Sequence, residues 1–285
     1  MNCRMKGLLL HPCAAIVLRQ LQGKPMDEST VLPATYDYRL VALSVLIAIC
    51  AARAALDLTG RVTAARNNSR LAWLFGGAIA MGTGIWSMHY TGMLAYRLPV
   101  PVYYHIPTVI FSLVAAICAS FIALFVVSRE RVTILNIVAG GLLMAAGIST
   151  MHYTGMAAMR LSAMHHYDGR LVLVSLAIAL FVSWAALGLT FQFRDDTSGG
   201  FLKLLCAITM GFAIPAMHYT AMAAVTYTPM QEAPDLFFAL DISALASSAI
   251  IISTFVLLGA VFLLRQRSVA HSRNAGVAPT HEQPA

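Results

Sequence analysis

Three histidines that stand in the same local sequence carry the chemistry that this chain offers. Each belongs to a Met-His-Tyr-Thr tetrapeptide, and another methionine follows four residues after the histidine. Steps of four keep side chains on one face of a helix, so imidazole and thioether groups share that face. The tyrosine hydroxyls can bridge helices or hold the second nitrogen of an imidazole. The candidate metal-binding residues are Met88, His89, Met93, Met151, His152, Met156, Met217, His218 and Met222, supported by Tyr90, Tyr153 and Tyr219.

The types of these candidate ligands indicate a soft metal. No Asp or Glu occurs on the three segments that carry the motif, which argues against calcium, magnesium, manganese and carboxylate-bound iron. Imidazole together with thioether suits copper, above all Cu(I). Two plainer interpretations stay open, because a histidine can serve as an interhelical hydrogen-bond donor and a methionine as packing material.

The segments that position these residues are long and apolar. Of the 285 residues, 59% are hydrophobic and 11% are charged, whereas soluble domains carry about a quarter charged residues. Each apolar block is near or above the ~20 residues that a helix needs to cross the hydrocarbon core of a membrane. Continuous apolar runs predict helices rather than barrel strands. The seven predicted helices lie within residues 40–58, 71–96, 106–127, 132–159, 171–191, 201–226 and 242–264.

The formal charge of +7 is distributed as expected for a protein of the membrane rather than a protein that binds nucleic acid. Lys and Arg concentrate on the cytoplasmic side of membrane proteins. Eleven of them fall at one end of the predicted helices if the first helix starts outside, and three fall in the opposite loops. We therefore predict an all-α integral membrane protein with seven transmembrane helices in an N-out/C-in orientation, which sets the three motifs in the outer part of the bilayer.

An internal repeat organises the chain. The segments MGTGIWSMHYTGMLAY (81–96), MAAGISTMHYTGMAAM (144–159) and MGFAIPAMHYTAMAAV (210–225) start 63 and 66 residues apart. Each repeat is thus a pair of helices, and the three motif helices run parallel with their histidines at one depth. We predict an N-terminal segment over 1–35 that is signal-like or precedes the true start, a six-helix domain of three repeats over 36–241, a seventh helix over 242–264 and a disordered cytoplasmic tail over 265–285.

The three spaced tetrapeptides resemble the MHYT-domain family of bacterial integral membrane proteins over about residues 36–241. The resemblance implies a sensory module in the bacterial inner membrane, with copper held near the outer face by the Met, His and Tyr residues of the motifs. It also implies sensing of a diatomic gas such as oxygen, carbon monoxide or nitric oxide. Many members resemble sensors fused to output domains. This chain ends soon after its seventh helix, so we expect signalling through a separate partner protein.

Two other functions stay open at this point. The first is copper transport or handling, although Met81, Met144 and Met210 are the only such ligands in the inner halves of the motif helices. The second is a haem-binding electron-transfer subunit, because His and Met are common axial haem ligands. We expect no enzyme, since no catalytic nucleophile, acid–base pair or phosphate loop is apparent. In the third motif helix, Pro215 predicts a kink and a geometry that departs from the other two copies.

Overall fold

Seven long helices make up most of the part of the chain that the structure describes, as the sequence predicts. The computed structural model describes residues 31–129, 131–193 and 200–275. Each of the seven helices is long and apolar enough to cross a membrane. The helices are α2 (Tyr38–Ala64), α3 (Asn67–Ala95), α4 (Ile106–Val127), α5 (Ile134–Ala157), α6 (Gly169–Phe193), α7 (Gly200–Ala223) and α8 (Ile242–Ala275).

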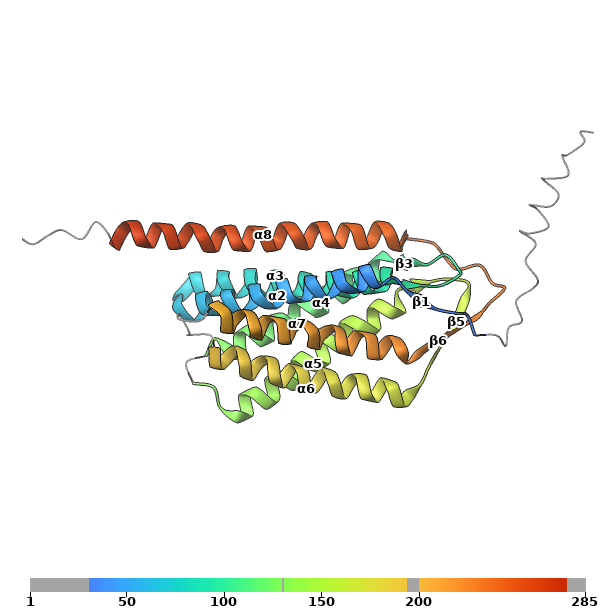
Figure 1. Ribbon diagram of the computed structural model, residues 1–285, viewed down its shortest axis with the longest axis horizontal. Helices are drawn as coiled ribbons and strands as arrows, with labels where there is room; N and C mark the ends of the chain where they lie inside the picture. The colour runs from blue at the N-terminus through green and yellow to red at the C-terminus, as the bar shows by residue number, and fades with distance from the viewer. Residues whose placement is uncertain (1–30, 130, 194–199, 276–285) are drawn as a thin grey trace, which may run out of the picture.

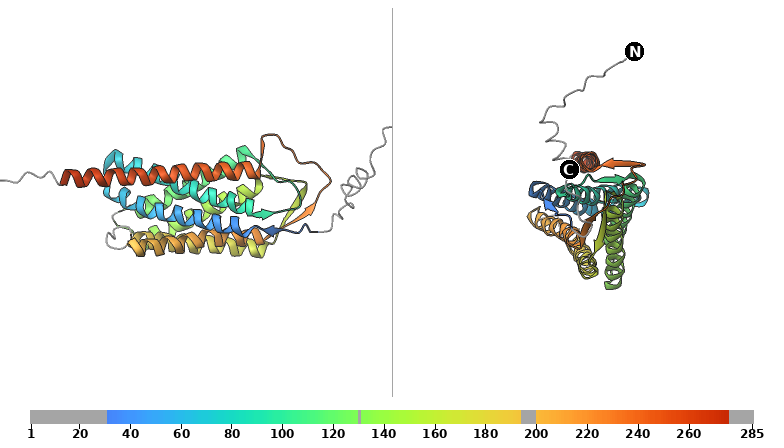
Figure 2. Two further views of the ribbon diagram at one scale, coloured as in Figure 1. Left: turned by 45° about the horizontal axis from the view of Figure 1, so that its top comes forward. Right: turned by 90° about the vertical axis from the view of Figure 1, so that its right-hand side faces the viewer.

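The first six of these helices close into a ring, and α8 lies outside it. Successive helices pack against each other from α2 to α7, and α7 packs back against α2. The seventh helix, α8, runs along the outside of the ring with its main contact on α3 (Figures 1 and 2). The motif helices α3, α5 and α7 therefore alternate around the ring with α2, α4 and α6, which gives the six-helix unit an approximate threefold arrangement.

The end of α8 differs from the prediction. We predicted that the last span ends at residue 264 and that a disordered tail follows, whereas α8 continues to Ala275. The residues from Arg265 include several charges and no proline before Pro279. A helix that projects beyond the hydrocarbon can tolerate such charges, so the loss of apolar character at 265 marks the end of the membrane core and not the end of the helix. The predicted segment over 1–35 lies mostly outside the described residues.

Short strands link the helices at the end of the ring that we predict to be outside, here called the outer end (Figure 1). They form two two-stranded sheets, β1–β2 and β5–β6, and one three-stranded sheet in the order β4–β3–β7. The pattern of apolar residues does not predict these strands, because they are only two to five residues long. The strands are β1 (Thr35–Tyr36), β2 (Tyr96–Arg97), β3 (Tyr103–His105), β4 (Met159–Arg160), β5 (Ala163–Tyr167), β6 (Val225–Pro229) and β7 (Ala239–Asp241).

Local signals fix where several helices begin. The Asp37 carboxylate accepts a hydrogen bond from the backbone N–H of Arg39 at the start of α2, and Asp168 does the same for Arg170 at the start of α6. At the start of α5, Thr133 forms a reciprocal capping box with Asn136. These caps satisfy backbone N–H groups that a helix leaves free in its first turn.

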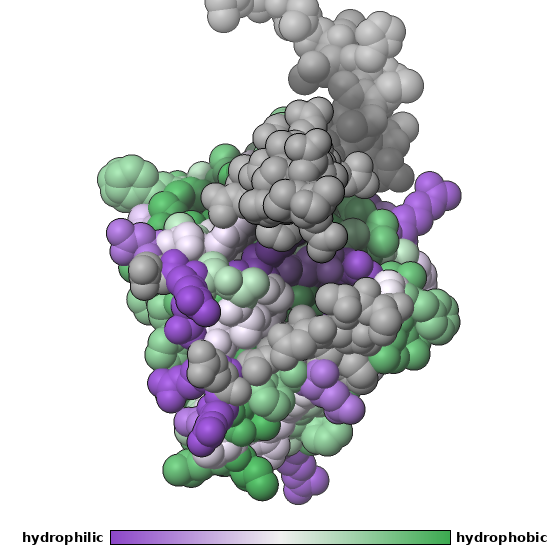
Figure 3. All heavy atoms as spheres, turned by 90° about the vertical axis from the view of Figure 1, so that its left-hand side faces the viewer, coloured by the Kyte–Doolittle hydropathy of each residue, from purple (hydrophilic) through white to green (hydrophobic). Residues whose placement is uncertain are grey.

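The opposite, inner end of the bundle is rich in hydrophilic residues. Purple hydrophilic side chains are spread over this end of the bundle, with green apolar side chains between them (Figure 3). Arg66, Arg129 and Arg131 are among the exposed residues there. A polar end face on an apolar cylinder fits a bundle that crosses a bilayer, and the N-out/C-in orientation stays a prediction from charge.

Pro215 changes the third motif helix less than predicted. The helix α7 is continuous from Gly200 to Ala223 with Pro215 inside it. His218 lies one turn later. Its Nδ1 atom is as far from those of His89 and His152 as these two are from each other. The predicted departure in geometry is therefore wrong at the histidine.

Candidate functional site

The three motif histidines meet on the axis of the ring. His89 comes from α3, His152 from α5 and His218 from α7, and each side chain is at most 1% exposed. Their Nδ1 atoms form an equilateral triangle with sides of 3.2 Å. Their rings stand edge to face, with centroids 5.0–5.1 Å apart. Three side chains separated by 63 and 66 residues thus offer three nitrogens to one point.

The ring nitrogens of these three imidazoles cannot all form hydrogen bonds with one another. A neutral imidazole carries one proton, on either Nδ1 or Nε2. All three Nε2 atoms are buried without a hydrogen-bond partner in the described structure. Each Nδ1 either carries a proton or offers a lone pair, so with any choice of tautomers at least two of the three Nδ1 atoms are of the same kind and face each other. A cation at the centre would accept all three lone pairs, so the donor set fits a metal.

The outward-facing Nε2 atoms lie against two glycines of neighbouring motif helices. A Cβ atom on Gly92 would stand 2.6 Å from His218 Nε2, and a Cβ on Gly155 would clash with His89 Nε2. The structure shows that the absence of a side chain at both positions makes room for an imidazole ring.

Each motif tyrosine packs edge-on against the histidine before it, with ring centroids 4.8–5.0 Å apart. Its hydroxyl reaches a serine near the outer end of a neighbouring helix instead of an imidazole nitrogen. Each of those serines gives its own proton to a backbone carbonyl three residues earlier at 2.7 Å, so the tyrosine is the donor. The pairs are Tyr90 with Ser112 at 3.4 Å, Tyr153 with Ser175 at 2.6 Å and Tyr219 with Ser44 at 2.8 Å.

These contacts always run from one repeat to the next. The tyrosine of the first repeat reaches a serine of the second, the second reaches the third, and Tyr219 of the third reaches Ser44 of the first. The histidine contacts follow the same order, because His89 lies against Gly155 and His218 against Gly92. The site is therefore shared among all three repeats.

A second layer of tyrosines covers the site from the outer end. Each precedes its serine by eight residues and packs near a motif tyrosine, with ring centroids 5.4–6.2 Å apart. The three are Tyr36, Tyr104 and Tyr167. Tyr104 is completely buried, and burial together with Tyr90 and Tyr227 raises its pKa well above the usual value.

The sequence carries a signal for these serines that the sequence analysis did not use. The segments YDYRLVALS (36–44), YHIPTVIFS (104–112) and YDGRLVLVS (167–175) share Tyr, Val and Ser at the same offsets. A search for repeats in the first helix of each pair, and not only in the motif helix, would have found them.

The six methionines predicted as ligands are all buried, at 4% exposure or less. The structure brings the three histidines within ligand range of one another, with their candidate ligand atoms within 4.8 Å. Coordination by the sulfur atoms stays a prediction. These methionines are Met88, Met93, Met151, Met156, Met217 and Met222.

Comparison with known protein families identifies the architecture. The family described as "Bacterial signalling protein N terminal repeat", MHYT, matches residues 82–140, 146–199 and 211–276. This chain belongs to the MHYT family. The three matched segments each begin beside or within one motif helix, so the family's repeat coincides with the repeat that places the three histidines.

Relatives with the MHYT region are signalling proteins. The chain is 43% identical over 198 residues to the bifunctional diguanylate cyclase/cyclic di-GMP phosphodiesterase MucR of Pseudomonas aeruginosa, which covers 69% of this chain and 29% of MucR. It is 36% identical over 210 residues to the cyclic di-GMP phosphodiesterase NbdA of the same organism, covering 73% of this chain and 27% of NbdA. It is 36% identical over 196 residues to the signaling protein YkoW of Bacillus subtilis, covering 68% and 24%.

The chain thus spans less than a third of the length of each of these curated relatives. No solved structure matches it. This MHYT chain is a multi-pass bacterial membrane protein that carries the repeat of a family of bacterial signalling proteins.

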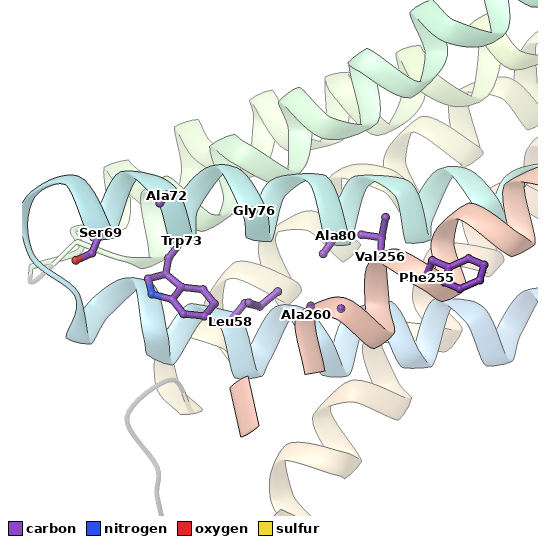
Figure 4. A pocket seen from close by; sticks show the side chains of 10 residues that line it. Leu58, Ser69, Ala72, Trp73, Gly76, Ala80, Phe255, Val256 and Ala260 are labelled. Carbon is purple, nitrogen blue, oxygen red and sulfur yellow. The ribbon is translucent and has the colours of Figure 1, made fainter. Parts of the chain in front are cut away.

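A cavity of about 370 Å³ lies away from the three motif histidines. It opens between α8 and the inner halves of α2 and α3, beside Leu58, Trp73 and Phe255 (Figure 4). Its lining contains no ionisable side chain. Near the histidines α8 packs closely on α3. Toward the inner end, this cavity separates α8 from α2 and α3.

Proposed function

We propose that this chain is a sensory module of the bacterial inner membrane that binds copper through its three motif histidines near the outer face. The observation that carries the proposal is the triangle of Nδ1 atoms. A point at its centre is about 1.8 Å from each nitrogen, close to the ~2.0–2.1 Å of metal–imidazole bonds. After a slight expansion of the triangle, the three histidines would hold the ion through these nitrogens.

The surroundings of the triangle support copper over harder metals. No carboxylate accompanies the three histidines in the group of candidate metal ligands found among the described residues. Buried methionines precede and follow each histidine at fixed offsets, and thioethers favour Cu(I). A copper ion held by the three imidazoles would supply a binding position for a diatomic gas such as oxygen, carbon monoxide or nitric oxide.

A route from the site to α8 supports a sensory role. Ser87 lies two residues before His89 on α3, and its hydroxyl is 3.0 Å from that of Ser253 on α8. A change in the position of the histidine helix would therefore reach the last helix of the chain directly. Output would follow through a separate signalling partner or through whatever adjoins α8.

The geometry argues against haem at this site. Axial ligands lie on opposite faces of a porphyrin, whereas these imidazole nitrogens are 3.2 Å apart and leave no room for a macrocycle between them. Copper transport or handling is the second candidate, because Met81, Met144 and Met210 line internal cavities on the inner side of the histidines.

The test uses the full chain, purified in mild detergent and loaded with Cu(I). We expect stoichiometric copper by elemental analysis, no Soret band, and a new carbon monoxide stretching band after the gas is added. The variant His89→Ala, His152→Ala and His218→Ala should bind one copper ion fewer per chain than the wild type. The matched control replaces His165 and His166, which are exposed on β5, and should keep it. Unchanged copper in the triple variant contradicts the proposed site.

A further inference from the structure

A second set of equivalent side chains lies on the inner side of the histidines. Met81, Met144 and Met210 each stand eight residues before a motif histidine. At about 1.5 Å per residue this places them roughly 12 Å from the histidine layer along the helices. Their side chains are 4%, 2% and 5% exposed, so all three point into the protein.

The three methionines share internal space. All three border a cavity of about 10 Å³, and all three border a second cavity of about 20 Å³. Alanines make this room, since Ala186 borders both cavities. A single water-sized particle needs about 10–15 Å³, so the space suits one ion and excludes an organic ligand.

The lining of these cavities decides what kind of particle fits. The smaller cavity is bordered only by Ala, Val, Ile and Met side chains, so a water molecule would lack the polar partners that it needs. The larger one adds Thr59, which donates to the Ala55 carbonyl, and Thr190, which lies 3.9 Å from the Met210 sulfur. The three methionines that border both cavities provide three thioether groups as candidate ligands.

We propose that Met81, Met144 and Met210 form a second soft-metal site for a monovalent cation such as Cu(I) or Ag(I). Thioether sulfur is polarisable and prefers soft ions, while calcium, magnesium and zinc need oxygen, nitrogen or thiolate ligands that are not among the residues lining the smaller cavity. Methionine has three rotatable bonds, so the sulfurs can turn into the adjoining space without movement of the helices.

An apolar layer separates the two sites. Ile85 and Ile214 line the smaller cavity on the side toward the histidines, one helical turn before His89 and His218. The inner site consists of residues outside the histidine cluster, and it binds its cation whether or not the histidines bind copper. It goes beyond the proposed function in this respect.

The experiment measures Ag(I), a soft ion without redox chemistry, on the full chain in detergent. The main variant is Met81→Leu, Met144→Leu and Met210→Leu, whose side chains are close to isosteric with the originals. The control is Met164→Leu, the same substitution at an exposed methionine of β5 that does not line either cavity. We expect the triple methionine variant to bind about one silver ion fewer per chain than the wild type, and the Met164→Leu control to bind as the wild type does.

A second measurement keeps the inference testable if the methionine variant does not fold. In the chain with His89→Ala, His152→Ala and His218→Ala, the inner site is intact, and X-ray absorption of bound silver should show sulfur neighbours and no nitrogen. Absence of bound silver in this variant overturns the inner site. So does a folded methionine variant that binds as much silver as the wild type. Loss of copper at the histidines alone would test the proposed function and leave the inner site standing.

Discussion

The hydroxyl of Ser253 on α8 lies 3.0 Å from the hydroxyl of Ser87 on α3, and both serines are buried. Ser87 also stands within one turn of His89, and Thr91 donates to its backbone carbonyl. This pair is therefore a polar contact through which α8 meets the helix that carries the first motif. Polar contacts between membrane helices contribute about 1 kcal/mol or less on average, enough to bias the packing of one helix on another.

We expect Ser253→Ala to weaken the link between the site and α8. The Ser87 hydroxyl loses its partner, so the melting temperature in detergent should fall modestly. The more specific readout is hydrogen–deuterium exchange of α8 with and without copper. The protection that copper confers on α8 should shrink in this variant. Ser248→Ala is the control, because its hydroxyl bonds only within α8. An equal loss of protection in both variants would argue against this contact as the link.

Gly155→Ala should disturb the metal site without touching a ligand. The added methyl group would occupy the space of the His89 ring edge, and overpacking of this kind costs about 1–3 kcal/mol. We expect copper affinity to fall by about tenfold or more, measured by competition with a Cu(I) chelator.

The matched control for this change is Gly188→Ala in α6. Nothing lies within 4 Å of a Cβ at that position, and alanine favours a helix over glycine by about 0.5–1 kcal/mol. The control should bind copper as the wild type does and melt at the same or a higher temperature. Normal copper affinity in Gly155→Ala would mean that the position of the His89 imidazole does not depend on the space beside Gly155.

The Tyr153–Ser175 hydrogen bond should be measurable by a double-mutant cycle. Ser175→Ala leaves the tyrosine hydroxyl without its acceptor, which costs about 1–3 kcal/mol where the group is buried. Tyr153→Phe removes the donor as well, so the double variant should recover part of that loss. The free energy of unfolding in mixed detergents gives the coupling. Strictly additive effects of the two changes would show that this contact contributes nothing.

Three tyrosines at the outer end of the ring predict an unusual alkaline titration. Burial raises the pKa of Tyr36, Tyr104 and Tyr227, with further contributions from neighbouring tyrosines. A raised phenol pKa stabilises the fold below the usual pKa of about 10, and the contribution is lost as pH rises through the folded value. Tyrosinate absorbance near pH 11 should thus stay below that of the denatured chain. Tyr104→Phe should reduce only the part of the tyrosinate absorbance that appears at the highest pH values.

The sequence predicted the scaffold because membrane length and hydropathy are local properties. Seven apolar blocks gave the seven helices, with ends that differ by a few residues except at α8. The equal depth of His89, His152 and His218 also followed from repeat spacing, and the structure confirms that they meet.

The directions of the side chains could not be predicted in the same way. Steps of four place a histidine on a helix face, but they do not say which ring nitrogen points to the axis. That choice follows from packing against another repeat, since Gly92 receives the Nε2 edge of His218. The partner of Tyr219 was equally hidden, because Ser44 is 175 residues away and belongs to the first helix of the domain.

The one-way order of these contacts has a consequence for how the chain is connected. Every repeat receives a contact from the repeat before it and gives one to the repeat after it, and Tyr219 with Ser44 closes the circle. No repeat is first in this pattern. A circular permutant of the six-helix unit could be opened at an inner turn and rejoined between α7 and α2. It would keep every one of these pairings. Three separate helical hairpins assembled around a common axis would keep them as well.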